Sequence, residues 1–147
     1  MRLIIKKKPR QQYAALPLSI DQDGQQQVLL VTSRETGRWI IPKGWAEKGV
    51  KAHVLAAREA YEEAGLRGDI GQEPIGRYRY TKWLRRTRRA KAVSCEVAVF
   101  ALRVNQQLDD WPEKGQRERC CFSPAQAALL VEEVNLMTLL LEFAAVE

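Results

Sequence analysis

The sequence predicts an α/β domain that consists mostly of strands and carries two helices. Short segments that alternate or run apolar, as strands do, recur along the chain with turn residues between them. Two stretches, residues 50–64 and 123–143, are instead rich in helix formers. A chain of 147 residues buries about 70 % of the surface that it exposes when unfolded. We therefore expect a single domain over residues 1–147.

The predicted strands are bounded by turn residues. The first two strands are joined through "DQDGQQ", in which Asp23 and Gly24 form a turn signal. A third, short strand stops at Pro42, and a loop to Gly49 follows. A basic stretch is predicted to be the hairpin loop between the fourth and fifth strands. The six ranges are 13–20, 27–32, 38–41, 76–80, 93–104 and 116–122.

Both predicted helices have end signals. Gly65 follows the first helix and is a natural residue just past a helix end. Ser123 is a suitable N-cap for the second helix, and Pro124 occupies its first position. We expect this second helix to run without interruption to about Phe143.

Composition and cysteine usage predict a cytoplasmic protein with no membrane partner. The longest apolar runs, such as 127–131 and 139–141, are far shorter than the roughly 20 residues that span a bilayer. The first ten residues lack the apolar stretch of a signal peptide. Three cysteines, with Cys120 and Cys121 adjacent, match neither a disulfide framework nor a zinc-site spacing. Thiols in a reducing compartment are the expected state.

The positive charge is concentrated in one segment. The formal net charge is +6, and residues 77–91, "RYRYTKWLRRTRRAK", contain eight basic residues and no acid. Such a local patch predicts a polyanionic partner, and the alternative is a solvated hairpin that only maintains solubility. Tyr78, Tyr80 and Trp83 lie among these cations, so a stacking surface for single-stranded RNA is a further alternative.

Three glutamates share one face of the first predicted helix. At about 100° per residue, Glu62 and Glu63 lie within about 60° of Glu59. Like charges at this spacing cost about 0.2 to 0.5 kcal/mol per pair. The face is either solvated, with Arg58 bridging to Glu62, or a site for hard divalent cations. The opposite face carries an apolar stripe of Val54, Ala57, Tyr61 and Ala64.

The wider spacing resembles the signature of the Nudix hydrolases. The matching residues are Gly44, Arg58, Glu59, Ala60, Glu62, Glu63, Gly65 and Leu66, and Val50 stands where the signature has a glutamate. "QVLLVTSRETGRWIIPKG", "DDWPE" and "RERCCFSPAQA" are similar to the branch that includes diphosphoinositol polyphosphate phosphohydrolases. The resemblance covers about residues 12–143 and implies an α/β/α sandwich around a mixed β-sheet.

The resemblance also implies a chemistry, the hydrolysis of a diphosphate linked to another moiety with Mg²⁺ or Mn²⁺. It implies that Glu59, Glu62 and Glu63 are metal ligands, together with a backbone carbonyl near Lys43 or Gly44. One of the three carboxylates would act as the base or orient the water. Which one does so stays open.

A distant acid and an arginine complete the implied catalytic set. Glu113 is the first candidate for an acid from a distant loop, with Glu96 and Glu118 as alternatives. Arg58 would be structural and tie the loop to the helix. Its usual partner is the glutamate that Val50 replaces. Either Glu47 substitutes, or the site works with fewer acids, or activity has been lost, and we favour an active enzyme.

Three functions remain open for the substrate. The first is hydrolysis of a highly phosphorylated small molecule, such as a dinucleoside polyphosphate or a diphosphoinositol polyphosphate. The second is removal of diphosphate from an RNA end, and the third is a non-catalytic module that binds RNA or polyphosphate. The chain could act as a monomer or a homodimer. The candidate substrate-binding residues are Arg10, Arg38, Lys43, Arg85, Arg86, Arg88 and Arg89.

Overall fold

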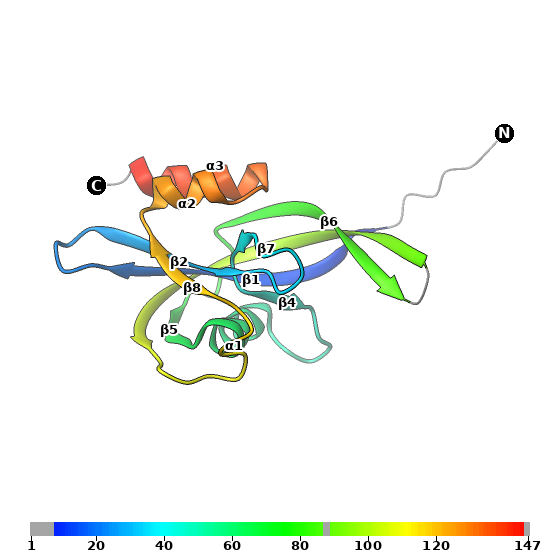
Figure 1. The fold of residues 1–147 in the computed structure, drawn as a ribbon, viewed down its shortest axis with the longest axis horizontal. Coiled ribbons are helices and arrows are strands. Elements are labelled where there is room, and N and C mark those ends of the chain that lie inside the picture. The colour runs from blue at the N-terminus through cyan, green and yellow to red at the C-terminus, as the bar shows by residue number, and fades with distance from the viewer. Residues whose placement is uncertain (1–7, 87–88, 146–147) are drawn as a thin grey trace.

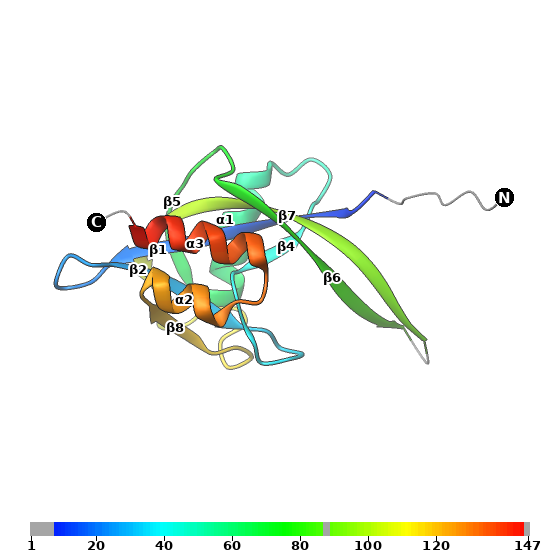
Figure 2. The same cartoon turned by 90° about the horizontal axis from the view of Figure 1, so that it is seen from above.

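A computed structural model describes residues 8–86 and 89–145, except for the side chains of residues 85, 86 and 89. Its helices lie on both sides of a central sheet (Figures 1 and 2). The strands are β1 (Arg10–Ile20), β2 (Gln26–Thr32), β3 (Trp39–Ile40), β4 (Lys43–Trp45), β5 (Leu66–Ile70), β6 (Gly76–Arg86), β7 (Arg89–Gln107) and β8 (Arg119–Phe122). The helices are α1 (Ala52–Ala64), α2 (Pro124–Leu130) and α3 (Val134–Ala145).

The sheet is mixed. Its main order is β3-β2-β1-β7-β5, with β4 paired to β1, β6 to β7 and β8 to β2. The pairing of β1 with β7 is parallel, and the other strand pairs are antiparallel. Helix α1 covers one face, while α2 and α3 cover the other (Figure 1). This confirms the α/β/α sandwich.

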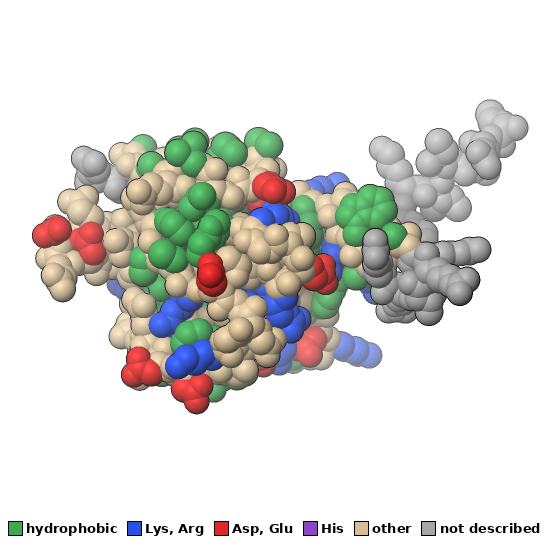
Figure 3. Space-filling view, viewed as in Figure 1, with side chains coloured by type: hydrophobic (Ala, Val, Ile, Leu, Met, Phe, Trp, Pro, Cys, Tyr) green, Lys and Arg blue, Asp and Glu red, His purple; other side chains and the backbone are tan. Residues whose placement is uncertain are grey.

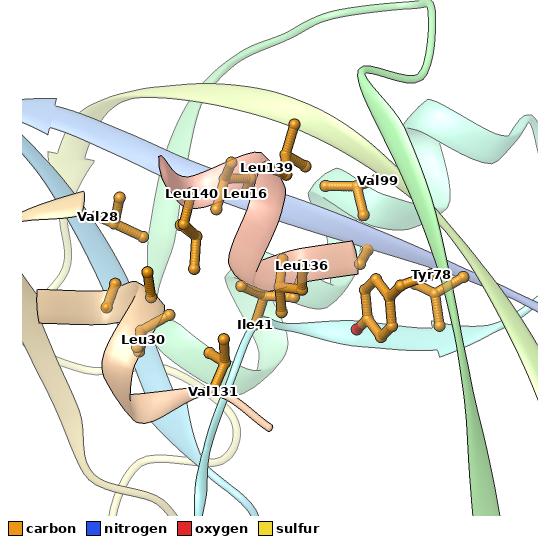
Figure 4. Close-up of a cluster of buried hydrophobic side chains, with 14 residues drawn as sticks. Leu16, Val28, Leu30, Ile41, Tyr78, Val99, Val131, Leu136, Leu139 and Leu140 are labelled. Atoms are coloured by element: carbon orange, nitrogen blue, oxygen red, sulfur yellow. The ribbon is translucent and has the colours of Figure 1, made fainter. Parts of the chain in front are cut away.

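The alternation of β1 divides the core into two layers. Ala14 and Leu16 point toward α2 and α3, where Leu16 shares a cluster with Leu140 (Figure 4). Ala15 points the other way, into a cluster with Ala60 of α1. The small alanine side chains let α1 lie close to the sheet, which determines where its glutamates stand.

The single helix predicted for 123–143 is wrong, because the chain forms α2 and α3 instead. The Ser123 side chain does cap α2, with Gln126 completing the capping box. Helix α2 ends at Val131, whose backbone is extended. The next two residues, Glu132 and Glu133, turn toward Arg38 on the sheet side. Helix propensity gave no sign of this break because the ion pairs that accompany it are long-range.

The basic stretch is strand rather than hairpin loop. Strands β6 and β7 pair as far as Arg86 and Arg89, and this ribbon extends away from the body of the domain (Figure 2). The predictions also missed β4 and β5, which are short and contain glycine. Helix α1 begins at Ala52, two residues later than expected. Among the described residues, no helix is long and apolar enough to cross a membrane.

We expect Leu140→Ala to lower the free energy of unfolding by about 2 to 5 kcal/mol, because it empties a fully buried position between α3 and the sheet. Urea denaturation measures this change. Leu129→Ala is the matched control, since the Leu129 side chain is 84 % exposed. Equal losses in the two variants would contradict the described packing of α3.

Candidate active site

Helix α1 presents its glutamates toward strand β4. Glu59 lies against Gly44, where any side chain would collide with the Glu59 carboxylate. Gly44 therefore lets the Glu59 carboxylate approach β4 in this position, in addition to the role that the signature assigns to it. The helix ends at Gly65, whose left-handed backbone has φ 65°. A side chain there would also strike the Trp111 ring.

Glu63 is a buried carboxylate held by two donors. The Lys43 backbone N–H donates to its Oε2 at 3.1 Å, and an Arg117 guanidinium nitrogen lies 3.2 Å from its Oε1. The two side chains of this ion pair are only 9 % and 6 % exposed. Burial raises the pKa of the Glu63 carboxyl to about 7, although the charges of Arg117 and Lys43 act in the opposite direction.

Arg117 also positions the candidate loop acid. Its Nε donates to Glu113 Oε1 at 3.1 Å, and its Nη1 donates to the Thr32 carbonyl at 3.1 Å. The Glu113 backbone N–H donates to the Glu62 carbonyl at 3.0 Å. The structure thus brings Glu113 to the end of α1 that carries Glu62 and Glu63.

Two further side chains attach this loop to the end of α1. The Trp111 indole donates to the Glu63 carbonyl at 3.2 Å. Arg119 donates to the Ala64 carbonyl at 2.7 Å and lies 4.3 Å from the centre of the Trp111 ring. Sequence reasoning missed Arg117, Trp111 and Arg119. The only sequence signal for Arg117 was its position four residues after Glu113.

Arg58 forms an ion pair with Glu47. Both side chains are partly exposed, at 40 % and 50 %. Val50 lies in the same loop, where its backbone N–H donates to the Glu47 carbonyl at 3.2 Å. Among the described ion pairs, Arg58 does not bridge to Glu62. The loop and helix are therefore joined through Glu47, three residues before the position where the signature has its acid.

The α1 carboxylates crowd one another electrostatically. Burial and then the negative charges of Glu63 and Glu62 raise the pKa of the Glu59 carboxyl to about 7. Glu113 adds to the same effect. Within the described ranges, no three acidic, histidine or cysteine side chains converge into a preformed metal cage. The hard oxygen donors nevertheless fit a divalent cation, whose charge would offset their repulsion.

Arg38 and Lys43 lie on the opposite face of the sheet from α1. Arg38 pairs with Glu133 at 2.8 Å and lines a cavity of about 560 Å³ between β6 and the start of α3. The Lys43 ammonium lies 5.2 Å from the centre of the Tyr80 ring. Burial lowers its pKa to about 8, and the charges of Glu63 and Glu133 oppose that shift.

The other predicted residues lie apart from the glutamates or cannot be placed. Glu96 pairs with Arg79 at 3.1 Å, and Glu118 is exposed. Arg10 lies over Trp45, 5.1 Å from its ring centre. Lys and Arg side chains gather across the middle of the face shown in Figure 3, below α2 and α3. Arg88 lies outside the described residues, as do the side chains of Arg85, Arg86 and Arg89.

The mixed sheet lies between two layers of helices, and one of these helices, α1, carries the glutamates that face β4. The chain belongs to the NUDIX domain family, whose model matches residues 10–139. This confirms the resemblance found in the sequence. The Nudix hydrolases of this family generally use divalent metal ions.

The curated relatives are longer than this chain. Nudix hydrolase 13, mitochondrial, of Arabidopsis thaliana is 30 % identical over 135 residues, which cover 85 % of this chain and 63 % of the relative. Mouse diphosphoinositol polyphosphate phosphohydrolase 3-alpha is 34 % identical over 88 residues, covering 59 % of this chain and 48 % of the relative. The chain thus spans between about half and just under two thirds of these proteins.

Solved structures share the fold. An Ap4A hydrolase of C. elegans superposes with a TM-score of 0.60 at 19 % identity and covers 94 % of this chain and 98 % of its own. The E. coli dihydroneopterin triphosphate pyrophosphohydrolase has a TM-score of 0.66 at 15 % identity and covers 93 % and 97 %. At these identities the likeness shows the fold alone.

We expect Arg117→Ala to lower the free energy of unfolding by about 3 to 5 kcal/mol, because it leaves the buried Glu63 carboxylate without its counter-charge. Chemical denaturation at pH 8 measures the loss. Arg34→Ala is the control, because Arg34 is 56 % exposed and its Nη1 lies 3.7 Å from Glu113 Oε1, a longer contact than those of Arg117. We expect it to change stability by less than about 1 kcal/mol. A loss of that small size in Arg117→Ala would contradict the buried pair.

Proposed function

We propose that the chain is a metal-dependent pyrophosphohydrolase. It hydrolyses a diphosphate linkage in a highly phosphorylated small molecule, such as a dinucleoside polyphosphate or a diphosphoinositol polyphosphate. The observation that carries this proposal is the placement of the α1 glutamates beside β4 and the Glu113 loop: Glu59 lies against Gly44, Glu63 accepts from the Lys43 N–H, and the Glu113 N–H donates to the Glu62 carbonyl. Family membership supports it, since relatives in the family bear hydrolase names.

The proposed cofactor is Mg²⁺ or Mn²⁺. Glu59, Glu62 and Glu63 would hold it, with a backbone carbonyl near Lys43 or Gly44. A bound divalent cation supplies charge neutralisation at the phosphate oxygens and lowers the pKa of bound water. The chain itself contributes fixed carboxylates, one of which orients the attacking water. Glu113, held by Arg117, is the proposed additional acid.

Cations on the opposite face of the sheet from α1 support an anionic substrate. Lys43 connects this face with the glutamates, because its backbone contacts Glu63 while its side chain lies near Tyr80, which lines the same cavity as Arg38. Arg10 lies further along that face. Arginine forks suit phosphate geometry, and the positive field would speed capture of a polyanion. We propose the same role for Arg85, Arg86, Arg88 and Arg89.

RNA is the second candidate, as a substrate with a 5′ diphosphate or triphosphate end or as a ligand of a non-catalytic module. The observation that favours it is the projecting β6–β7 ribbon (Figure 2). This ribbon is basic and exposes 64 % of Trp83. Stacking on an exposed aromatic among cations is a common way to bind single strands.

A reducing, cytoplasmic location is also part of the proposal. Its support is that Cys95, Cys120 and Cys121 are free thiols in the described structure. Adjacent Cys120 and Cys121 alternate along β8, which separates their side chains. Either a monomer or a homodimer is compatible with the proposed activity.

We expect Glu62→Gln to lower the rate of phosphate or nucleotide release from diphosphate compounds at least about hundredfold with Mg²⁺ present, because it removes a metal-binding charge. A panel of such compounds, assayed with Mg²⁺ and Mn²⁺, measures the rate. Glu73→Gln is the control, since Glu73 is exposed and belongs to the loop between β5 and β6. An unchanged rate in Glu62→Gln would contradict the assignment.

We expect Glu47→Ala to lower both activity and thermal stability, because Arg58 then loses its ion-pair partner. Val50→Glu should be tolerated or improve the rate, since it restores the acid that the signature has at this position. Turnover with Mg²⁺ and the thermal midpoint measure the two effects. A Val50→Glu variant that loses activity would show that the site has been rebuilt around the missing acid.

A further inference from the structure

Trp45 is an exposed aromatic residue immediately beside the candidate active site. Its side chain is 37 % exposed, although it directly follows Gly44, the residue that touches Glu59. Two cations accompany its ring. The Arg10 guanidinium lies 5.1 Å from the ring centre, and the Lys82 ammonium lies 5.7 Å from it.

The strand registers place this group on one face of the sheet. Gln12 is the partner of Trp45 across the β1–β4 pair, and it accepts a hydrogen bond from Tyr80 at 2.6 Å. Lys82 follows Tyr80 by two residues, so both side chains point to the same face of β6. A cavity of about 420 Å³ opens there, and Arg10, Trp45 and Leu84 are among its lining residues.

The position of β4 connects this face with the glutamates. Successive strand side chains point to opposite faces, so Trp45 lies across the strand from the contact between Gly44 and Glu59. In the described structure β4 pairs only with β1. Strand β4 is therefore an edge strand, although its Lys43 N–H is already bonded to Glu63. A phosphate chain that joins the α1 carboxylates to the Trp45 ring has only this one strand to pass.

We propose that Trp45, Arg10 and Lys82 form a subsite for the base and adjoining phosphate of a nucleoside polyphosphate. This inference rests on the proposed function, because the same ligand would place its diphosphate linkage at the α1 glutamates. The indole stacks on the base, and the two cations bind the phosphate. A polyphosphate without a base would use the cations alone. An exposed indole is therefore better matched to a nucleotide than to a phosphorylated inositol.

The test compares two ligands that share a tetraphosphate chain, of which only one carries nucleosides. We would measure the Kd of diadenosine tetraphosphate and of inorganic tetraphosphate by calorimetry with Mg²⁺, in the Glu62→Gln background. We expect an added Trp45→Leu to raise the Kd of the dinucleotide about tenfold and to leave that of tetraphosphate within about twofold. Trp45→Phe, which keeps a ring, should lose less. Arg10→Gln with Lys82→Gln should weaken both ligands.

Ile20→Ala is the control. Ile20 is a large apolar side chain that is 73 % exposed, and it lies at the opposite end of β1 from Arg10. We expect no change in either Kd. If Trp45→Leu fails to fold, indole fluorescence gives the answer without that variant. The dinucleotide, but not tetraphosphate, should quench the parent protein, and Trp45→Phe should remove most of the quenching.

The outcomes separate the subsite from the proposed activity. Equal effects of Trp45→Leu on both ligands, or none on either, would overturn the subsite even if the enzyme hydrolyses diphosphates. The expected pattern in a protein that hydrolyses no diphosphate would establish the subsite and refute the activity. The Kd of a short 5′-triphosphorylated RNA, measured alongside, shows whether the base at Trp45 belongs to a dinucleotide or to an RNA. The base belongs to the ligand whose Kd Trp45→Leu raises by the larger factor.

Discussion

The buried pair of Arg117 with Glu63 is the interaction on which the arrangement of the site depends. A carboxylate this far from water must be either protonated or compensated by donors. Glu63 draws its donors from β4 and from the loop before β8. Arg117 in turn binds Glu113 and the Thr32 carbonyl. The Glu63 charge on α1 thereby holds β4, the loop before β8 and β2 in place against the helix.

Close packing imposes a second constraint, and small residues satisfy it. Helix α1 meets the sheet through alanines such as Ala60, and this brings Glu59 against Gly44. At its end, Gly65 leaves room for the Trp111 ring. Glycine at position 44 thus leaves room for the Glu59 side chain, and glycine at position 65 provides both room and a left-handed backbone. A larger residue at either place would displace a carboxylate or the loop that carries Glu113.

The sequence predicted the parts whose causes are local. Alternating strands, the Ser123 cap and the shared glutamate face all follow from residues near one another in the chain. The missed features depend on distant partners. Strand β4 exists because it pairs with β1, and the break before α3 is accompanied by ion pairs to Arg38. To predict the role of Arg117 one must know that Glu63 is buried. The period of a helix shows which residues share a face, but it does not show whether that face is buried.

Lys43 contacts residues on both faces of the sheet, between the proposed catalytic glutamates and the proposed substrate-binding cations. Its backbone N–H binds Glu63, while its ammonium lies near the Tyr80 ring and interacts with the charge of Glu133. Burial lowers the pKa of that ammonium to about 8, so most of it still carries charge at pH 7. An anion that contacts Lys43 neutralises a cation that acts on Glu63. An anion bound on the proposed substrate face would therefore change the electrostatics of the carboxylate site directly, with no need for a movement of the fold.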